Sequence, residues 1–196
     1  MILGLTGLIG SGKSEVAAVF GRLGAEIISG DDLGREVIEH DSVAFYRLVV
    51  EFGPTILNPN RTLNRRALGL LAFASAEKTE ILNEIVHPGL LNRLDQRIAR
   101  VRARGGHAVV DAALLIAWNY NRKMDYTILV NSISRLRQER LLARGLTEEE
   151  IRRRTKSQLS LAVLRRESNL IITNNKDLAD LRKKAEKMYL GLIKRG

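Results

Sequence analysis

The sequence contains no cysteine among its 196 residues, which excludes a disulfide framework and any metal site built from thiolates. It also lacks an unbroken apolar run of the roughly 18 to 20 residues that a membrane-spanning helix requires. The amino terminus has neither the basic start nor the continuous apolar stretch of a signal peptide, because glycines interrupt it. We therefore expect a cytoplasmic protein. A composition of 45% hydrophobic and 28% charged residues is typical of one globular domain.

Aromatic residues are scarce, at 5% of the sequence, whereas positive charge is abundant, with a net charge of +10. Such a charge favours anionic partners, among them nucleotides, nucleic acids and acidic lipid surfaces. The excess is concentrated between Arg135 and Arg166, where ten Lys or Arg residues accompany four Glu. No aromatic residues alternate with these charges as a base-stacking surface requires. The segment is therefore either a solvated helix face or a surface that contacts phosphate groups.

Short β-prone segments alternate with helical segments along much of the chain. The segment "ILGLT" precedes a glycine-rich loop and then "KSEVAAVFGRL", in which apolar residues recur at helical spacing. Further strands are expected in "EII", "HAVVDA", "DYTILVN" and "NLIIT", and a closing helix in "DLADLRKKAEKMYLGLIKRG". This alternation indicates an α/β fold with a parallel sheet, and it leaves the strand order open.

Residues 41–105 contain helical patterns but no convincing strand. The segment is too long for a simple crossover, so we expect a helical insertion at one edge of the sheet. Within it, the helix "AEKTEILNEIV" is expected to stop at His87-Pro88, because proline disfavours helix in the residue before it. Further along, the spacing of Thr147 and Glu150 predicts a capping box at the start of another helix.

The stretch from Gly7 to Ser14 matches the pattern G-x-x-x-x-G-K-[ST]. In such a loop, glycines let backbone amides surround the α- and β-phosphates of a nucleotide, a lysine reaches the β/γ oxygens, and the serine hydroxyl binds magnesium. The amino terminus of a helix adds a favourable dipole for the phosphates. The motif lies between an expected strand and an expected helix, as this mechanism requires, so we expect nucleotide binding.

Three aspartates lie after expected strands. Asp111 ends "HAVVD", where an acid either holds magnesium, directly or through water, or caps a turn. Asp31 and Asp32 follow the second strand, on the sheet edge where ligands of open α/β sheets bind. A carboxylate there either accepts the proton of an attacking hydroxyl or caps the next helix. The spacing from the strand does not choose between Asp31 and Asp32.

Two further candidates are basic. His87 is either a structural residue beside a proline or part of a site. Arg140 and Arg144 are four residues apart, so they share a helix face and can bring two guanidinium groups onto a γ-phosphate.

Taken together, the motifs resemble those of the dephospho-coenzyme A kinase family over almost the whole chain. The segments that carry the resemblance are "GLTGLIGSGKSEVA", "ISGDDLGREV", "EIVHPGL", "VVDAALLI", "RLLARGLTEEEIRRRTKSQ" and "NLIITNN". The resemblance implies a three-layer P-loop kinase fold in a single domain, 1–196. Its expected parts are a core (1–40, 106–139 and 168–196), a helical substrate-binding insertion (41–105) and a lid (140–167).

The resemblance implies transfer of the ATP γ-phosphoryl group, with Mg²⁺ as cofactor, to the 3′-hydroxyl of the ribose of dephospho-coenzyme A. The implied catalytic residues are Lys13, Asp31 and Arg140, and Asp31 is now favoured over Asp32 as the proton acceptor. The implied ATP contacts are Leu8, Ile9, Gly10, Ser11, Gly12, Lys13, Ser14, Glu15, Arg140 and Asn174. The implied acceptor contacts are Asp31, Arg35, His87, Leu114 and Leu115, and the implied metal ligands are Ser14 and Asp111. ATP and dephospho-coenzyme A are the expected partners, without nucleic acid or membrane.

Several positions depart from the family's pattern. They are Glu15 for threonine, Ser29 for aspartate, Ala113 for proline, Ala117 for glutamate, and Ser168-Asn169 for Ala-Asp. None of them replaces Lys13, Asp31 or Asp111.

Two other functions fit parts of the sequence. A related phosphotransferase acting on a nucleoside monophosphate or another small alcohol would share the loop, the insertion and the lid. A nucleotide-dependent switch or a nucleic-acid-binding protein would use the basic segment as its contact surface, and its affinity for nucleic acid would fall steeply with salt. A GTPase switch should carry an N-K-x-D motif, and "NNKD" at 174–177 lacks the intervening residue.

Overall fold

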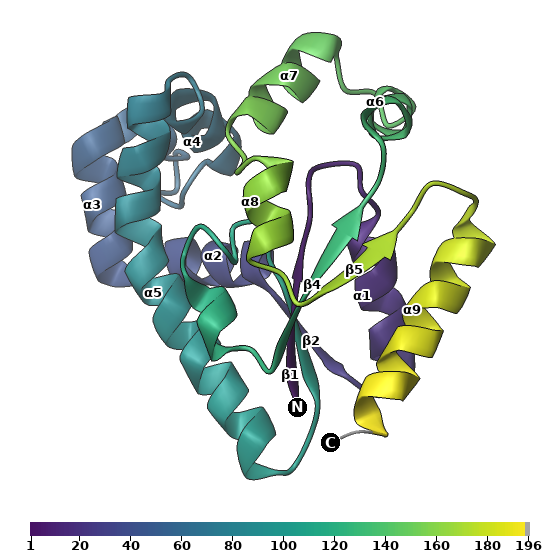
Figure 1. Ribbon diagram of the computed structural model, residues 1–196. Helices are drawn as coiled ribbons and strands as arrows, with labels where there is room; N and C mark the ends of the chain where they lie inside the picture. The colour runs from purple at the N-terminus through teal and green to yellow at the C-terminus, as the bar shows by residue number, and fades with distance from the viewer. Residues whose placement is uncertain (195–196) are drawn as a thin grey trace. The chain divides into compact units, whose positions relative to one another are not determined.

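The computed structural model describes residues 1–194, shown as a ribbon in Figure 1. The chain divides into two compact units. The first consists of Met1–Ser29 together with Ile98–Gly196, and the second of Gly30–Arg97. The last two residues of the expected closing helix, 195–196, lie outside the described part of the chain.

A sheet of five parallel strands forms the centre of the first unit, in the order β2-β3-β1-β4-β5. The strands are β1 (Ile2–Thr6), β2 (Glu26–Ser29), β3 (Ala108–Asp111), β4 (Tyr126–Asn131) and β5 (Leu170–Thr173). All five residues of β1 are buried, as expected of the middle strand of a sheet covered on both faces. Because every strand runs the same way, all carboxyl ends lie at one edge of the sheet. This confirms the expected α/β fold with a parallel sheet.

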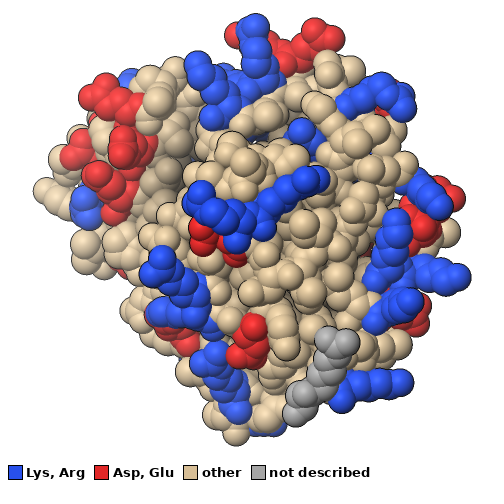
Figure 2. All heavy atoms as spheres, viewed as in Figure 1, with Lys and Arg blue, Asp and Glu red and all other residues tan. Residues whose placement is uncertain are grey.

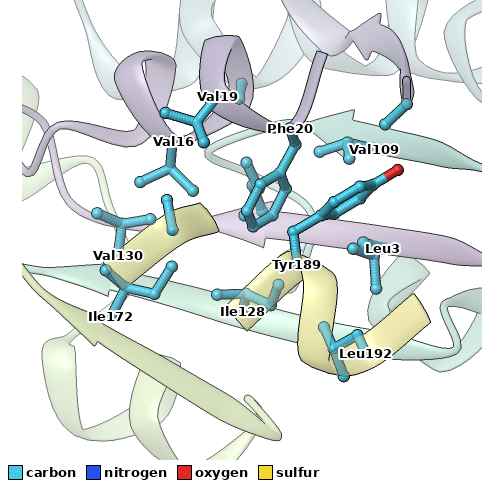
Figure 3. Close-up of a cluster of buried hydrophobic side chains, with 14 of the residues drawn as sticks. Leu3, Val16, Val19, Phe20, Val109, Ile128, Val130, Ile172, Tyr189 and Leu192 are labelled. Atoms are coloured by element: carbon cyan, nitrogen blue, oxygen red, sulfur yellow. The ribbon is translucent and has the colours of Figure 1, made fainter. Parts of the chain in front are cut away.

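Helices α1 (Lys13–Arg22) and α9 (Leu178–Ile193) cover one face of this sheet. Figure 3 shows the core between them and the strands, where the rings of Phe20 and Tyr189 stack with centroids 4.9 Å apart. Both aromatic residues are fully buried. The apolar spacing seen in the sequence of α1 thus points its side chains at the sheet and at α9.

The opposite face carries a smaller apolar cluster. Leu8 and Leu129 are buried in it together with Leu164 of helix α8 (Leu161–Arg166). The connection after β3 includes a 3₁₀ turn, η2 (Tyr120–Lys123). The cluster packs Leu8 of the glycine-rich loop against the segment that precedes β5.

Helices α6 (Ser134–Leu142) and α7 (Glu148–Lys156) form the segment between β4 and α8. The predicted capping box is confirmed: the backbone N–H of Glu150 donates to Oγ1 of Thr147, and that of Thr147 donates to the Glu150 carboxylate at 2.9 Å. The Glu150 carboxylate accepts from the N–H and also from the hydroxyl of Thr147, and these two bonds hold the pKa of Glu150 below its usual value. The start of α7 is therefore fixed by its own sequence.

The second unit is helical. Its elements are α2 (Gly30–His40), α3 (Ser42–Phe52), η1 (Pro54–Ile56), α4 (Arg65–Ala72) and most of α5 (Ala76–Ala103). Gly89 allows α2 and α5 to pack closely, because a Cβ added there would lie 3.0 Å from Val37. The residue pair Leu57 and Leu63 forms an isolated antiparallel bridge, so no strand element occurs in the described residues of this unit.

The predicted helix stop at His87-Pro88 is wrong, since α5 continues through Pro88 to Ala103. A proline inside a helix costs about 3 kcal/mol through its missing hydrogen bond and its ring. The buried residues Val86, Leu90 and Leu94 continue at helical spacing across the proline. Their burial offsets this cost, because each such side chain contributes roughly 1.5–3 kcal/mol.

Candidate active site

The glycine-rich loop connects β1 to α1 at the carboxyl edge of the sheet. Gly12, directly before α1, has a φ of 97°, a left-handed conformation that glycine adopts most readily. A Cβ at this position would also lie 2.4 Å from Nδ2 of Asn174. The second glycine of the motif is therefore required both by the backbone turn and by the close approach of a side chain.

Three consecutive residues of the loop are each held by a side chain from a distant part of the first unit. The N–H of Ile9 donates to Oε1 of Gln158 at 2.9 Å. The carbonyl of Gly10 accepts from Nη1 of Arg140 at 3.4 Å, and the carbonyl of Ser11 accepts from Nδ2 of Asn174 at 2.8 Å. These bonds define the path of the loop backbone.

These bonds also decide where the loop's free amides point. In a trans peptide the C=O and the N–H point in opposite directions, so the bond that Asn174 makes to the Ser11 carbonyl turns the Gly12 N–H the other way. No hydrogen bond between described residues takes the N–H groups of Gly12, Lys13 or Ser14. Amides at a helix start lack intrahelical acceptors and favour negative charge. The loop therefore offers a set of donors suited to an anion.

Arg140 and Asn174 form the centre of a polar network beside the loop. Nη2 of Arg140 donates to the backbone carbonyl and to Oδ1 of Asn174, at 3.1 and 3.2 Å. Ser132, directly after β4, accepts from Nη1 of Arg140 and donates to the Asn174 carbonyl at 2.7 Å. Asn174 itself is 5% exposed. The structure thus brings together two residues predicted to contact ATP, and both contact the loop.

Lys13 and Asp111 meet at the same edge of the sheet. The ammonium group of Lys13 donates to Oδ1 of Asp111, and the two side chains are 19% and 15% exposed. Strand pairing places Asp111 opposite Leu5 on β1 and opposite Ser29 on β2. The tertiary structure therefore joins the loop lysine to the carboxylate that the sequence suggested as a metal ligand.

The metal ligands expected from the sequence supply oxygen donors only. Ser14 lies in the first turn of α1 and is exposed, and Asp111 ends β3. A serine hydroxyl and one carboxylate suit Mg²⁺, which keeps several waters and binds through few protein oxygens. Among residues 1–194 no cluster of three or more His, Asp or Glu side chains could hold a metal by itself. The donor set thus fits a metal that arrives with a phosphate ligand.

Two residues that depart from the family's pattern accept hydrogen bonds through their side chains. Glu15 accepts from Nε of Arg182 at 2.6 Å, which ties the first turn of α1 to α9. Oδ1 of Asn169 accepts from the N–H of Thr127 at 2.7 Å. An aspartate carboxylate makes the same kind of bond, so the asparagine preserves the link between β4 and the residue before β5.

The residues predicted to contact the acceptor lie mostly in the second unit. Asp31 and Asp32 both lie in the first turn of α2 and are exposed. Nη1 of Arg35 donates to Oδ1 of Asp32 at 3.0 Å. His87 lies on α5, next to Val86, which packs near Gly34 of α2. Burial lowers the pKa of His87, so the neutral ring is favoured there.

The two leucines predicted to contact the acceptor have different environments in the first unit. Leu114 is partly exposed, whereas Leu115 is fully buried. Leu115 packs beneath β1, since a Cβ at Gly4 would lie 2.4 Å from its Cδ2. Leu115 therefore supports the central strand.

Several residues at the loop were not predicted from the sequence. Gln158 and Ser132 were not singled out, although Gln158 binds the loop at Ile9 and Ser132 binds Arg140. Arg137 was also missed: its Nε is buried without a partner among the described residues, and burial lowers the pKa of its guanidinium. The only sequence signal for Gln158 was its place as a polar residue just beyond the basic helix α7, separated from it by Ser157.

Lys and Arg side chains gather on the surface of α7 and α8, as Figure 2 shows in the same view as Figure 1. The exposed residues are Arg152, Arg153, Arg154, Lys156, Arg165 and Arg166. This surface belongs to the same segment that holds the loop through Arg140 and Gln158. No helix among residues 1–194 has the length and apolar character needed to cross a membrane.

The parallel sheet, the loop with its free amides and the lysine at the start of α1 define a P-loop kinase. Comparison with known proteins identifies the group more closely, because the family model described as dephospho-CoA kinase matches residues 1–180. The chain belongs to the dephospho-CoA kinase family.

Individual relatives agree with this assignment. A dephospho-CoA kinase from Corynebacterium efficiens is 38% identical over 195 residues, which cover 98% of both chains. A crystal structure of a protein from Thermus thermophilus has a TM-score of 0.81 at 30% identity, covering 98% of this chain and 97% of that one. A dephospho-CoA kinase from Campylobacter jejuni, at 20% identity and a TM-score of 0.70 over 97% and 96% of the two chains, shares the fold.

Proposed function

We propose that this protein transfers the γ-phosphoryl group of ATP to the 3′-hydroxyl of the ribose of dephospho-coenzyme A, the last step of coenzyme A synthesis. The observation that carries the proposal is the loop itself. In a chain of this family, the unpaired N–H groups of Gly12, Lys13 and Ser14 lie next to the Lys13–Asp111 pair. We also infer that the reaction takes place in the cytoplasm.

The first unit supplies the groups for ATP. The free amides of the loop bind the phosphates, and Lys13 neutralises charge on the β- and γ-phosphates. Mg²⁺ bound with ATP would be held by the Ser14 hydroxyl and the Asp111 carboxylate. When bound, it supplies charge neutralisation between the β- and γ-phosphates. Arg140 keeps the loop in position through Gly10 and Asn174.

The second unit supplies the groups for the acceptor. Asp31 accepts the proton of the 3′-hydroxyl as its oxygen attacks the γ-phosphorus. The new O3′–P bond forms while the bond from the γ-phosphorus to the β,γ-bridging oxygen breaks, and ADP leaves with that oxygen. Arg35 and His87 contact the acceptor from α2 and α5. Because phosphoryl transfer is mainly positioning and charge neutralisation, these few groups suffice.

The test is an assay of ADP formation at fixed Mg²⁺, with and without dephospho-coenzyme A, combined with the mass of the product. We expect turnover that depends on the acceptor and a product heavier by one phosphate. An analogue that lacks the 3′-hydroxyl should be inert. Turnover with that analogue, or with a nucleoside monophosphate in place of dephospho-coenzyme A, would contradict the proposed acceptor.

A further inference from the structure

The segment that contains α7 is attached to the glycine-rich loop at both of its ends. At the near end, Arg140 of α6 donates to the carbonyl of Gly10. At the far end, Gln158 accepts from the N–H of Ile9, the neighbouring loop residue. Residues 141–157 therefore lie between two anchors that bind neighbouring residues of the loop, Ile9 and Gly10.

The Gln158 bond fixes one particular peptide unit. The N–H of Ile9 and the carbonyl of Leu8 belong to the same planar group. Gln158 takes the N–H at 2.9 Å, and the N–H of Ser11 donates to the Leu8 carbonyl at 3.0 Å. Both polar groups of the Leu8–Ile9 peptide therefore make a hydrogen bond in the first turn of the loop. The bond at its N–H depends on Gln158.

Apolar packing at the same place keeps Gln158 in position. Leu8, which precedes Ile9, is buried in the apolar cluster on which Leu159 also packs. Leu159 follows Gln158, so the residues next to both partners of the hydrogen bond share one apolar environment. The backbone N–H of Gln158 donates to the carbonyl of Thr155 at 3.2 Å, which continues the last turn of α7. Because the backbone of Gln158 is held in this way, only its side-chain torsions lose freedom when it makes the bond to Ile9.

We propose that Gln158 is a positioning residue for ATP: its carboxamide oxygen holds the Leu8–Ile9 peptide so that the following loop amides face the phosphates. This inference rests on the proposed function only in taking the loop to bind ATP. Because only Ser157 separates Gln158 from the end of α7, the same bond keeps the basic helix α7 attached to the loop. Loss of one such hydrogen bond corresponds to roughly a tenfold loss of affinity.

The experiment compares Gln158→Leu with the parent protein and with Gln138→Leu. Gln138 is an exposed residue of α6 whose side chain makes no hydrogen bond with any described residue. Calorimetric titration with Mg·ATP, without any acceptor, should give an approximately tenfold higher Kd for Gln158→Leu and no change for Gln138→Leu. The KM for dephospho-coenzyme A and the melting temperature without ATP should stay near the parent values.

An unchanged Kd for ATP in Gln158→Leu would overturn the proposal. A melting temperature that falls together with the affinity would overturn it as well, because it would show a merely structural role. Since the titration contains no acceptor, a wrong assignment of the acceptor would leave this result intact.

A second variant keeps the inference testable if Gln158→Leu does not fold. Gln158→Glu retains an oxygen acceptor, so hydrogen exchange at the Ile9 amide, followed by NMR without ATP, should remain as slow as in the parent. Fast exchange in Gln158→Glu would show that the side-chain oxygen does not hold this peptide, and would overturn the proposal.

Discussion

The ammonium group of Lys13 donates to Oδ1 of Asp111, which joins the start of α1 to the end of β3. Both side chains are largely buried, so each charge has the other as its counter-ion in a place that water reaches poorly. In the reaction that we propose, Lys13 would bind the phosphates of ATP and Asp111 would hold Mg²⁺. The pair therefore keeps both groups at the site and ready to exchange partners.

Replacing Lys13 by alanine should lower kcat by a factor of about 100 to 1,000, because it removes a charge that stabilises the transferring phosphoryl group. The assay is ADP formation with saturating dephospho-coenzyme A. Lys187→Ala, at an exposed position of α9, provides the control for the loss of one positive charge and should behave like the parent. A Lys13→Ala protein with near-normal kcat would remove the loop lysine from the mechanism.

Asp31→Asn should abolish transfer to the acceptor and leave the affinity for ATP unchanged, because the amide cannot accept the proton of the attacking hydroxyl. Asp32→Asn is the matched control, since both carboxylates lie in the first turn of α2. Measuring kcat and the Kd for ATP separates the two roles. Loss of ATP binding in Asp31→Asn would instead assign this carboxylate to the nucleotide or its metal, and loss of transfer only in Asp32→Asn would exchange the two assignments.

Tyr189→Phe should leave the free energy of unfolding unchanged or raise it by up to about 1 kcal/mol, because it removes a buried hydroxyl without a partner. The hydroxyl of Tyr189 makes no hydrogen bond with any described residue, and burial raises the pKa of this phenol. Phe20→Ala, which removes the ring stacked on Tyr189, should lower the free energy of unfolding by about 3–5 kcal/mol. Urea unfolding measures both, and a clear destabilisation by Tyr189→Phe would show that the hydroxyl does have a bonding partner.

His87 should make the protein less stable as the pH falls. Burial lowers the pKa of His87 in the folded state, whereas the unfolded chain takes up a proton near the usual value of about 6.5. Below that pH the unfolded state binds more protons than the folded state, so the free energy of unfolding decreases as the pH falls toward the folded-state pKa.

The corresponding experiment is chemical unfolding of the parent and of His87→Asn between about pH 7.5 and 5.5, a window that spans the usual histidine value. The variant should lose less stability over this range than the parent does. His40→Asn, at an exposed position in the last turn of α2, is the control. An equal loss in the parent and in His87→Asn would show that other groups cause the acid sensitivity.

The local elements were predictable because their causes lie within a few residues. The apolar spacing of α1 and the capping box of Thr147 and Glu150 both appear in the structure as expected. The failed prediction at Pro88 has a non-local cause, since the helix persists through burial of its neighbours against other elements. At that position, packing against other elements stabilises the helix by more than the proline destabilises it.

By itself, the sequence determined the loop motif, the alternation of strands and helices and the family. These depend on residue type and on short spacings along the chain. The order of the strands and the Lys13–Asp111 pair were decided only by the tertiary structure. The tertiary structure also decided the hydrogen bond between the loop and Gln158, which is 149 residues from its partner Ile9. Contacts of this kind form when the parallel sheet brings distant segments to one edge, and no local pattern records which side chain will meet which peptide group.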